Sequence, residues 1–410
     1  MSGPPFAPAC LISGEPARGA WDFGAGIVPL NHGSYGAVPR AVTELQGRMQ
    51  ARADRSAIGW FPHTPAWVAQ ARAGLAGFVG AAADDTIFVP NASAAATVVY
   101  NSLRLEPGDE ILVTDHAYGA IVMGAERLAR RAGAVLRTVH LGLEDDDEAV
   151  VAAFARAIGP RTKLVVVDQI TSPTARILPT ARIADVAHAA GARVLVDGAH
   201  APGLIGDAAR VAGGDWWFGN LHKWPSAPRG SALLVTSAAD RDELWPLIDS
   251  WHARLSYPER FDMQGTLDVT PYLASPMAIG WLEENYGWAR ARATMTANAD
   301  AAADAVAEAV APYLDGPARP TVASPAPSMR LVRLPGALGS SREEADSLRD
   351  RLYRETGIES AFTSFDGAGF VRLSVHLYTT AADIDAFNDR AVPLLVEWSR
   401  EPGGGRPATN

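Results

Sequence analysis

One lysine stands out among the residues that could do chemistry. The chain has 36 basic residues, but only Lys163 and Lys223 are lysines. Lys223 lies in GNLHKWP (219–225), where aromatic neighbours can desolvate the amine and lower its pKa. A neutral amine is the nucleophile that forms a Schiff base with a carbonyl group. The simpler interpretation is a surface lysine whose stem packs on apolar groups while its charge reaches water.

A carboxylate and a histidine follow another apolar segment. Residues 193–197 (RVLVD) end in Asp197, and His200 comes three residues later. A carboxylate at the end of a strand can hold a protonated pyridine nitrogen, which makes that ring an electron sink. Taken alone, Asp197 is more simply explained as a turn or capping residue.

Small residues between a predicted strand and a predicted helix form a candidate phosphate site. In PNASAA (90–95), Ala92 and Ser93 would let backbone N–H groups and a hydroxyl approach a phosphate at a helix N-terminus. An N-cap serine explains the same segment equally well. No glycine fingerprint for dinucleotides accompanies it, which disfavours a nicotinamide oxidoreductase.

These segments follow short apolar runs that alternate with helical patterns. Such alternation predicts an α/β fold with a mostly parallel sheet covered on both faces. Ligands of these sheets bind beyond the carboxyl ends of the strands, where Asp197 and Lys223 are expected. Beyond about residue 276 the pattern changes to a small α+β domain. The expected strands are 86–89, 110–114, 135–140, 163–168, 193–197, 216–219 and 232–235, and the expected helices include 93–105, 119–132, 180–190 and 288–312.

Composition narrows the function classes. A length of 410 residues allows one large and one smaller domain. A net charge of -10 without a basic run argues against nucleic-acid binding. The single cysteine, Cys10, permits neither a disulfide within the chain nor a cysteine metal site, and no metal is expected. Without a signal peptide or an apolar run of membrane-spanning length, the expected location is the cytoplasm, with no membrane contact.

Several motifs, taken in their order along the chain, resemble the class V aminotransferase family of pyridoxal-5′-phosphate (PLP) enzymes, and within it the isopenicillin N epimerase-like branch. The resemblance covers about residues 28–395. It implies the fold type I architecture, with a mostly parallel seven-stranded sheet in a large PLP-binding domain at 28–280. A smaller α+β domain is expected at 281–400, with loose ends at 1–27 and 401–410. The motifs are LNHGSYG (30–36), PNASAAAT (90–97), TDHAYGA (114–120), TSPTARILP (171–179), VDGAHAPG (196–203), GNLHKW (219–224), QGTLD (264–268) and VRLSVHLYTT (371–380).

The resemblance implies roles for residues at the matching positions. Lys223 would hold PLP as a Schiff base and later move protons at the substrate Cα, while Asp197 would pair with the pyridine nitrogen. Arg372 would bind the substrate carboxylate, with His32 and Tyr35 lining the substrate mouth. The other implied cofactor contacts are His200 near the phenolic oxygen, Tyr118 stacked on the ring, Ser172 near the cofactor oxygen, Ala92, Ser93, Asn220 and His222 at the phosphate, and Thr266 at the phosphate of a partner subunit.

Thr266 therefore implies a homodimer with composite active sites. Ser172 stands where related enzymes have an asparagine, which changes the hydrogen bonding at the cofactor oxygen. Cys10 is the only cysteine, and a persulfide-forming desulfurase needs one on a late active-site loop. We therefore expect a different reaction on the amino-acid substrate.

The resemblance implies chemistry at Cα or Cβ of an amino acid. Members of the branch include epimerases, C–S lyases and tailoring enzymes of lincosamide antibiotics. We expect C–S β-elimination on an S-substituted cysteine, because a carbanion beside a good leaving group eliminates without a second acid. Epimerisation, decarboxylation-dependent oxidative deamination and transamination stay open. A cofactor-binding regulatory protein without activity is disfavoured because Lys223, Asp197 and Arg372 are all present.

Overall fold

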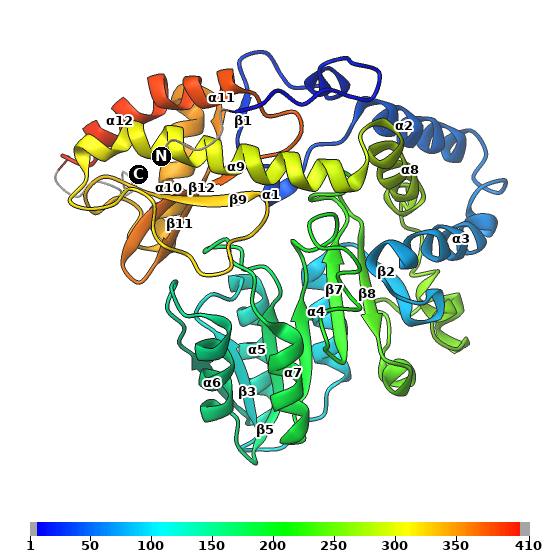
Figure 1. The fold of residues 1–410 in the computed structure, drawn as a ribbon. Helices are drawn as coiled ribbons and strands as arrows, with labels where there is room; N and C mark the ends of the chain where they lie inside the picture. The colour runs from blue at the N-terminus through cyan, green and yellow to red at the C-terminus, as the bar shows by residue number, and fades with distance from the viewer. Residues whose placement is uncertain (1–5, 402–410) are drawn as a thin grey trace. The chain divides into compact units, whose positions relative to one another are not determined.

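The chain divides into two compact units in a computed structural model that describes residues 6–401 (Figure 1). The large unit comprises Ala37–Thr171 and Ile177–Trp281, and the small unit comprises Met1–Gly36, Ser172–Arg176 and Leu282–Asn410. Residues 1–5 of the predicted loose N-terminal segment, and 402–410 of the predicted tail, lie outside the described residues. Within the described part, no helix is long and apolar enough to cross a membrane.

The large unit is built on a seven-stranded sheet of order β2-β8-β7-β6-β5-β3-β4. Neighbours from β7 to β4 run parallel, whereas β8 pairs antiparallel with both β7 and β2. The predicted mostly parallel seven-stranded sheet is therefore confirmed. The strands are β2 (Thr86–Val89), β3 (Glu110–Thr114), β4 (Val135–Val139), β5 (Thr162–Asp168), β6 (Arg193–Asp197), β7 (Trp216–Asn220) and β8 (Ala232–Thr236).

Both faces of the central strands are buried, which explains the continuous apolar runs, whereas the edge strand β4 is largely exposed. Side chains alternate between faces along a strand. On β5, Leu164 and Val166 join one apolar cluster, and Val165 and Val167 join the other. The first cluster includes residues of α4 and α5, and the second includes residues of α3, α6 and α7 (Figure 1). The helices are α2 (Arg40–Arg55), α3 (Thr64–Ala76), α4 (Ala92–Ser102), α5 (Gly119–Ala132), α6 (Asp147–Ala157) and α7 (Thr180–Ala189), with α8 (Thr270–Asn285) following.

Local signals fix where these helices begin and end. Asp146 caps α6 by accepting the Ala149 N–H at 2.8 Å, and the acidic first turn suits the helix dipole. Helix α5 ends at Gly133, whose φ of 69° is the left-handed geometry that favours glycine. Helix α4 ends at Ser102, earlier than the expected residue 105, because Leu103 adopts extended backbone.

The small unit has an antiparallel sheet of order β11-β12-β9 and a short parallel pair, β1 and β10. Its apolar cluster joins that sheet to α9 and α10. The strands are β1 (Val28–Pro29), β9 (Met329–Arg333), β10 (Ile358–Glu359), β11 (Ala361–Phe365) and β12 (Ala368–Ser374). The helices are α1 (His32–Tyr35), α9 (Trp288–Val310), α10 (Arg342–Thr356), α11 (Ala381–Ala386) and α12 (Val392–Trp398).

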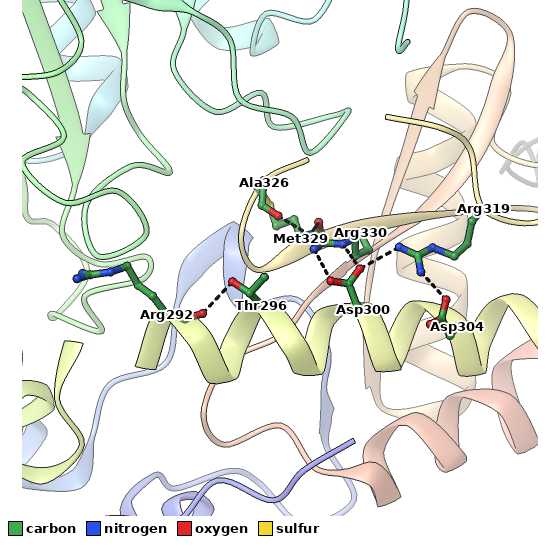
Figure 2. Close-up of polar contacts among 8 residues, drawn as sticks. All are labelled: Arg292, Thr296, Asp300, Asp304, Arg319, Ala326, Met329 and Arg330. Carbon is green, nitrogen blue, oxygen red and sulfur yellow. Dashed lines mark hydrogen bonds and ion pairs between the residues drawn. The ribbon is translucent and has the colours of Figure 1, made fainter. Parts of the chain in front are cut away.

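A buried arginine fastens β9 to α9 in this unit. Arg330 Nε and Nη2 donate to the two carboxylate oxygens of Asp300 at 2.7 and 2.8 Å (Figure 2). Arg319 donates to the same carboxylate at 3.0 Å and also pairs with Asp304. The hydrogen bond from Arg330 is the largest cause that lowers the pKa of Asp300. Bidentate geometry of this kind fixes the register of strand against helix.

A glycine beside the end of β6 gives a stability prediction. A Cβ added at Gly198 would lie 2.2 Å from Trp217 Nε1 and 2.8 Å from the Phe218 carbonyl oxygen. We expect Gly198→Ala to destabilise the cofactor-free protein by about 1–3 kcal/mol through overpacking. Gly47→Ala, in the exposed face of α2 with no atom within 4 Å, should stabilise it by about 0.5–1 kcal/mol. Urea unfolding midpoints compare the variants, and equal shifts in both would contradict the packing argument.

Candidate functional site

Lys223 lies in the turn after β7 in the large unit and is only 9% exposed. Its Nζ atom is 3.0 Å from His200 Nε2. The Trp224 indole N–H donates to the other nitrogen of that ring, Nδ1, at 3.3 Å. The predicted lysine and histidine are therefore brought together, although 23 residues separate them.

The Trp224 contact selects a tautomer of His200. A neutral imidazole carries its proton on one nitrogen only. Since Nδ1 accepts from Trp224, the proton of the neutral ring lies on Nε2 and faces Lys223. In its unprotonated form the Lys223 amine can accept from this N–H group, and that form is the one that attacks a carbonyl carbon.

Asp197 ends β6 with its carboxyl group buried. Burial raises its pKa to about 6, although the Ala199 N–H, donating at 2.9 Å, and the positive charge of Lys223 both act to lower it. A buried carboxylate without full compensation costs free energy and is relieved by a cationic partner. Asp197 thus suits a ligand that presents a protonated nitrogen.

A second carboxyl group, Asp168, lies beside Asp197 and was not predicted as a site residue. The two are register partners on the parallel strands β5 and β6. Burial raises the pKa of Asp168 well above its ordinary range, and the charge of Asp197 raises it further. The sequence signal was present, because residues 163–168 are an apolar run that ends in aspartate.

The predicted phosphate segment forms the N-terminus of α4. Asn91 is the N-cap and accepts the Ala94 N–H at 2.9 Å. The Ala92 N–H is bound to Asn220 Oδ1 at 2.9 Å, so Asn220 holds the start of this helix against the end of β7. Ser93 is exposed at the same terminus, where backbone N–H groups and the helix dipole favour an anion.

Three further predicted residues also lie in the large unit. His222 is partly buried and its Nδ1 lies 3.2 Å from the Ser231 carbonyl oxygen. Burial, and then the charge of Lys223, lowers the pKa of His222 to about 4, so the ring is neutral at pH 7. Tyr118 is the N-cap of α5 and is 42% exposed, and Thr266 lies exposed in the loop before α8.

Arg372 organises the predicted residues of the small unit. It lies on β12 and is only 3% exposed. Nη1 donates to the Ser172 carbonyl oxygen at 2.6 Å and to its hydroxyl at 2.9 Å. Nη2 donates at 3.3 Å to Asn31 Oδ1 and Ser34 Oγ. The structure therefore places Ser172, a predicted cofactor contact, against Arg372, the predicted substrate contact.

His32 belongs to a buried aromatic group in the same unit. Its Nδ1 lies 2.8 Å from the Tyr378 hydroxyl, and its ring stacks on His376 with centroids 3.9 Å apart. Tyr35, by contrast, is 64% exposed at the end of α1. His32 is therefore a packed neighbour of the residues that hold Arg372, whereas Tyr35 is exposed to solvent.

The large-unit residues fit PLP by their chemistry. A buried amine can bind the aldehyde, a buried carboxylate can accept the protonated pyridine nitrogen, and a helix N-terminus can accept the phosphate. The described residues contain no group of three or more His, Cys, Asp or Glu side chains that could hold a metal ion.

Comparisons with known proteins identify relatives along nearly the whole chain. The family model described as Aminotransferase class-V matches residues 37–387. Isopenicillin N epimerase of Streptomyces clavuligerus is 33% identical over 406 residues, covering 93% of this chain and 98% of the epimerase. Putative L-cysteine desulfhydrase 1 of Oryza sativa subsp. japonica is 26% identical over 427 residues, covering 95% and 88% respectively.

Solved structures share the fold at lower identity. A mutant of C-DES with glycine covalently linked to its PLP cofactor has a TM-score of 0.77 at 20% identity, covering 93% of this chain and 99% of that one. The complex between the cystine C–S lyase C-DES and its reaction product cysteine persulfide has a TM-score of 0.74 at 20% identity, covering 91% and 98%. The fold type I architecture is thereby confirmed.

Asp197 gives a prediction about pH. The pKa of Asp197 is about 6 in the folded protein, against an ordinary 3.8. The folded state therefore holds this proton more tightly than the unfolded state does, which favours folding at low pH. That contribution is lost as the pH rises from below 3.8 through 6. Replacing Asp197 with asparagine keeps the acceptor for Ala199 and removes that loss. We expect Asp197→Asn to stabilise the cofactor-free protein by about 2 kcal/mol more at pH 8 than at pH 4.

Denaturant unfolding of wild type and variant at the two pH values measures this difference. Comparing variants at each pH cancels the opposite contribution of His222, whose lowered pKa disfavours folding as pH falls. Asp185→Asn, on the exposed side of α7, is the control and should show no such pH dependence. A pH-independent effect of Asp197→Asn would mean that its carboxyl group is well solvated.

Proposed function

Because the chain belongs to the class V aminotransferase family of PLP-dependent enzymes, we propose that it eliminates the β-substituent of an S-substituted cysteine. The observation that carries this proposal is the buried Lys223–His200 pair at the carboxyl end of the sheet that also presents Asp197. An amine in that setting can both bind an aldehyde and exchange protons with a substrate carbon.

Each residue has a defined task in this proposal. Bound PLP supplies an electron sink for the charge that develops at Cα of the substrate. Lys223 holds the cofactor and, once released, takes the Cα proton on Nζ, while His200 orients that nitrogen. Asp197 keeps the pyridine nitrogen protonated. Ser93, Asn220 and His222 hold the phosphate at the N-terminus of α4, with Ala92 fixing the helix start, and Tyr118 covers the ring.

Arg372 binds the substrate carboxylate in this proposal. Its guanidinium is buried and held by two hydroxyls, an amide oxygen and a carbonyl oxygen. A substrate carboxylate would accept charge-assisted hydrogen bonds, which are stronger than those to neutral oxygens. Ser172 bonds this arginine and is also the proposed contact of the cofactor oxygen, while His32 and Tyr35 are the proposed residues of the substrate mouth.

The names of relatives support C–S cleavage on a cysteine derivative. They include an L-cysteine desulfhydrase and, among solved structures, a cystine C–S lyase. In the net reaction the Cα–H and Cβ–S bonds break, the thiol leaves with a proton, and water releases pyruvate and ammonia. The step needs one base, Lys223, and no acid on the opposite face of the substrate.

Epimerisation is the second candidate, and one observation favours it. Isopenicillin N epimerase is 33% identical along 98% of its length, more than the desulfhydrase. Epimerisation requires a proton donor on the face of Cα away from Lys223. A product assay separates the two reactions because only elimination breaks the carbon–sulfur bond.

The proposal includes a homodimer with composite active sites. Large apolar side chains are exposed along 245–267, a segment that includes the proposed phosphate contact Thr266. Exposed apolar surface is typical of association sites. Those side chains are Trp245, Leu247, Ile248, Trp251, Leu255 and Leu267, and Trp251 is 88% exposed.

Product analysis tests the reaction. We expect PLP-loaded protein incubated with S-methyl-L-cysteine in deuterated water to form methanethiol, pyruvate and ammonia. Proton NMR follows the loss of substrate and the formation of products. Lys223→Ala should lower the rate at least about 100-fold, because the base is lost. Lys163→Ala, the other lysine and exposed on β5, is the matched control and should keep both the rate and the yellow absorption of the cofactor.

If the recovered amino acid instead carries deuterium at Cα, keeps its carbon skeleton and accumulates as the D-isomer, the enzyme is an epimerase and the elimination proposal is wrong. Loss of carbon dioxide would point instead to decarboxylation. If the Lys223→Ala variant keeps the same yellow absorption as wild type, Lys223 is not the residue that binds the cofactor.

Sedimentation tests the dimer. We expect Trp251→Asp to convert a dimer into monomers at micromolar concentration, because a charge would be buried in an apolar interface. Tyr353→Asp, at an exposed position on α10, should remain dimeric. If the wild-type protein sediments as a monomer, the proposed composite active site and the proposed role of Thr266 are both wrong.

A further inference from the structure

Two carboxyl groups stand at the ends of neighbouring strands. Asp168 and Asp197 are partners in the parallel pairing of β5 with β6 and are each 3% exposed. Leu164 and Val166 on β5, and Leu195 on β6, belong to the cluster that contains α4 and α5. Because alternate residues share a face, both carboxyl groups lie on that side of the sheet.

Asp168 also reaches the start of α5. Its carboxyl group accepts the backbone N–H of Tyr118, the N-cap of that helix. A single side chain therefore contacts the backbone that positions Tyr118 and lies beside Asp197. No other role described above uses Asp168.

The surroundings of Asp168 decide its charge. The titratable groups described near it include Asp197 on β6, Lys223 after β7 and Tyr100 on α4, and His200 lies next to Lys223. Of the first three, Lys223 alone can be a cation, so ionising both carboxyls would leave two buried negative charges near at most one charged amine. Burial and the charge of Asp197 both raise the pKa of Asp168, and the pair shares its protons.

We propose that Asp168 is a positioning residue that stays protonated beside Asp197 and anchors the Tyr118 backbone. The pair then carries one negative charge, which matches one protonated pyridine nitrogen. The O–H group of Asp168 can donate to Asp197 while its carbonyl oxygen accepts from Tyr118. The link to cofactor chemistry rests on the proposed functions of Asp197 and Tyr118, but the protonation of Asp168 does not.

Infrared difference spectroscopy of the cofactor-free protein at pH 8 tests the protonation. We expect wild type to show the C=O stretch of a buried carboxylic acid that exchange into deuterated water shifts. D168N should lack this band, and D197N should keep it. A band that survives in D168N, or is absent from wild type, would overturn the proposal, whatever reaction the enzyme catalyses.

Paired substitutions test the positioning role in the PLP-loaded protein. Asparagine reproduces a neutral acid, with an oxygen that accepts from Tyr118 and an amide that donates to Asp197. D168N should therefore fold, keep the visible circular dichroism of bound PLP and change kcat less than about fivefold. D168A should weaken that dichroism and lower kcat at least about tenfold, because removing one member of a buried hydrogen-bonded set leaves its partners unpaired.

The opposite pattern is equally decisive. If D168N loses the dichroism as D168A does, or fails to fold, then Asp168 acts as an ionised carboxylate and the proposal is wrong. If Lys223→Ala retains the cofactor absorption while the infrared result holds, the assignment of Lys223 fails and Asp168 remains protonated for structural reasons.

Discussion

Burial of charge at the carboxyl ends of β5, β6 and β7 is the constraint on which the large unit depends. Asp168, Asp197 and Lys223 interact electrostatically in a region that protein atoms shield from water. A sheet covered on both faces supplies this shielding, and parallel register brings the strand ends together. Without those layers Asp197 would be an ordinary solvated carboxylate.

Much of this could be predicted from the sequence because the signals are local. Short apolar segments indicated the strands of the large sheet, most clearly the continuous runs at 163–168 and 193–197, and Gly133 marks the end of α5. Lys223 was conspicuous because arginine replaces lysine almost everywhere else. The class V motifs then gave the family, which comparisons along nearly the whole chain confirm.

What the sequence could not supply was register and distant contact. Asp168 is the last residue of the apolar run 163–168, but its pairing with Asp197 depends on how β5 aligns with β6. The contact of Arg372 with Ser172 joins residues 200 positions apart. Secondary-structure propensity and hydrophobic periodicity describe only a few neighbouring residues. The sequence around Arg372 therefore does not indicate that it contacts Ser172.

The segment Ser172–Arg176 has a consequence for how such a protein can evolve. It lies in the middle of large-unit sequence, yet it belongs to the small unit, where it contacts Arg372 and where Ala175 accepts the Ala326 N–H at 2.8 Å. The chain therefore passes between units after Gly36, Thr171, Arg176 and Trp281. Neither unit corresponds to one uninterrupted stretch of gene, so recombination cannot exchange either as a cassette. New substrates must instead be acquired by point substitution and loop change within a chain inherited whole.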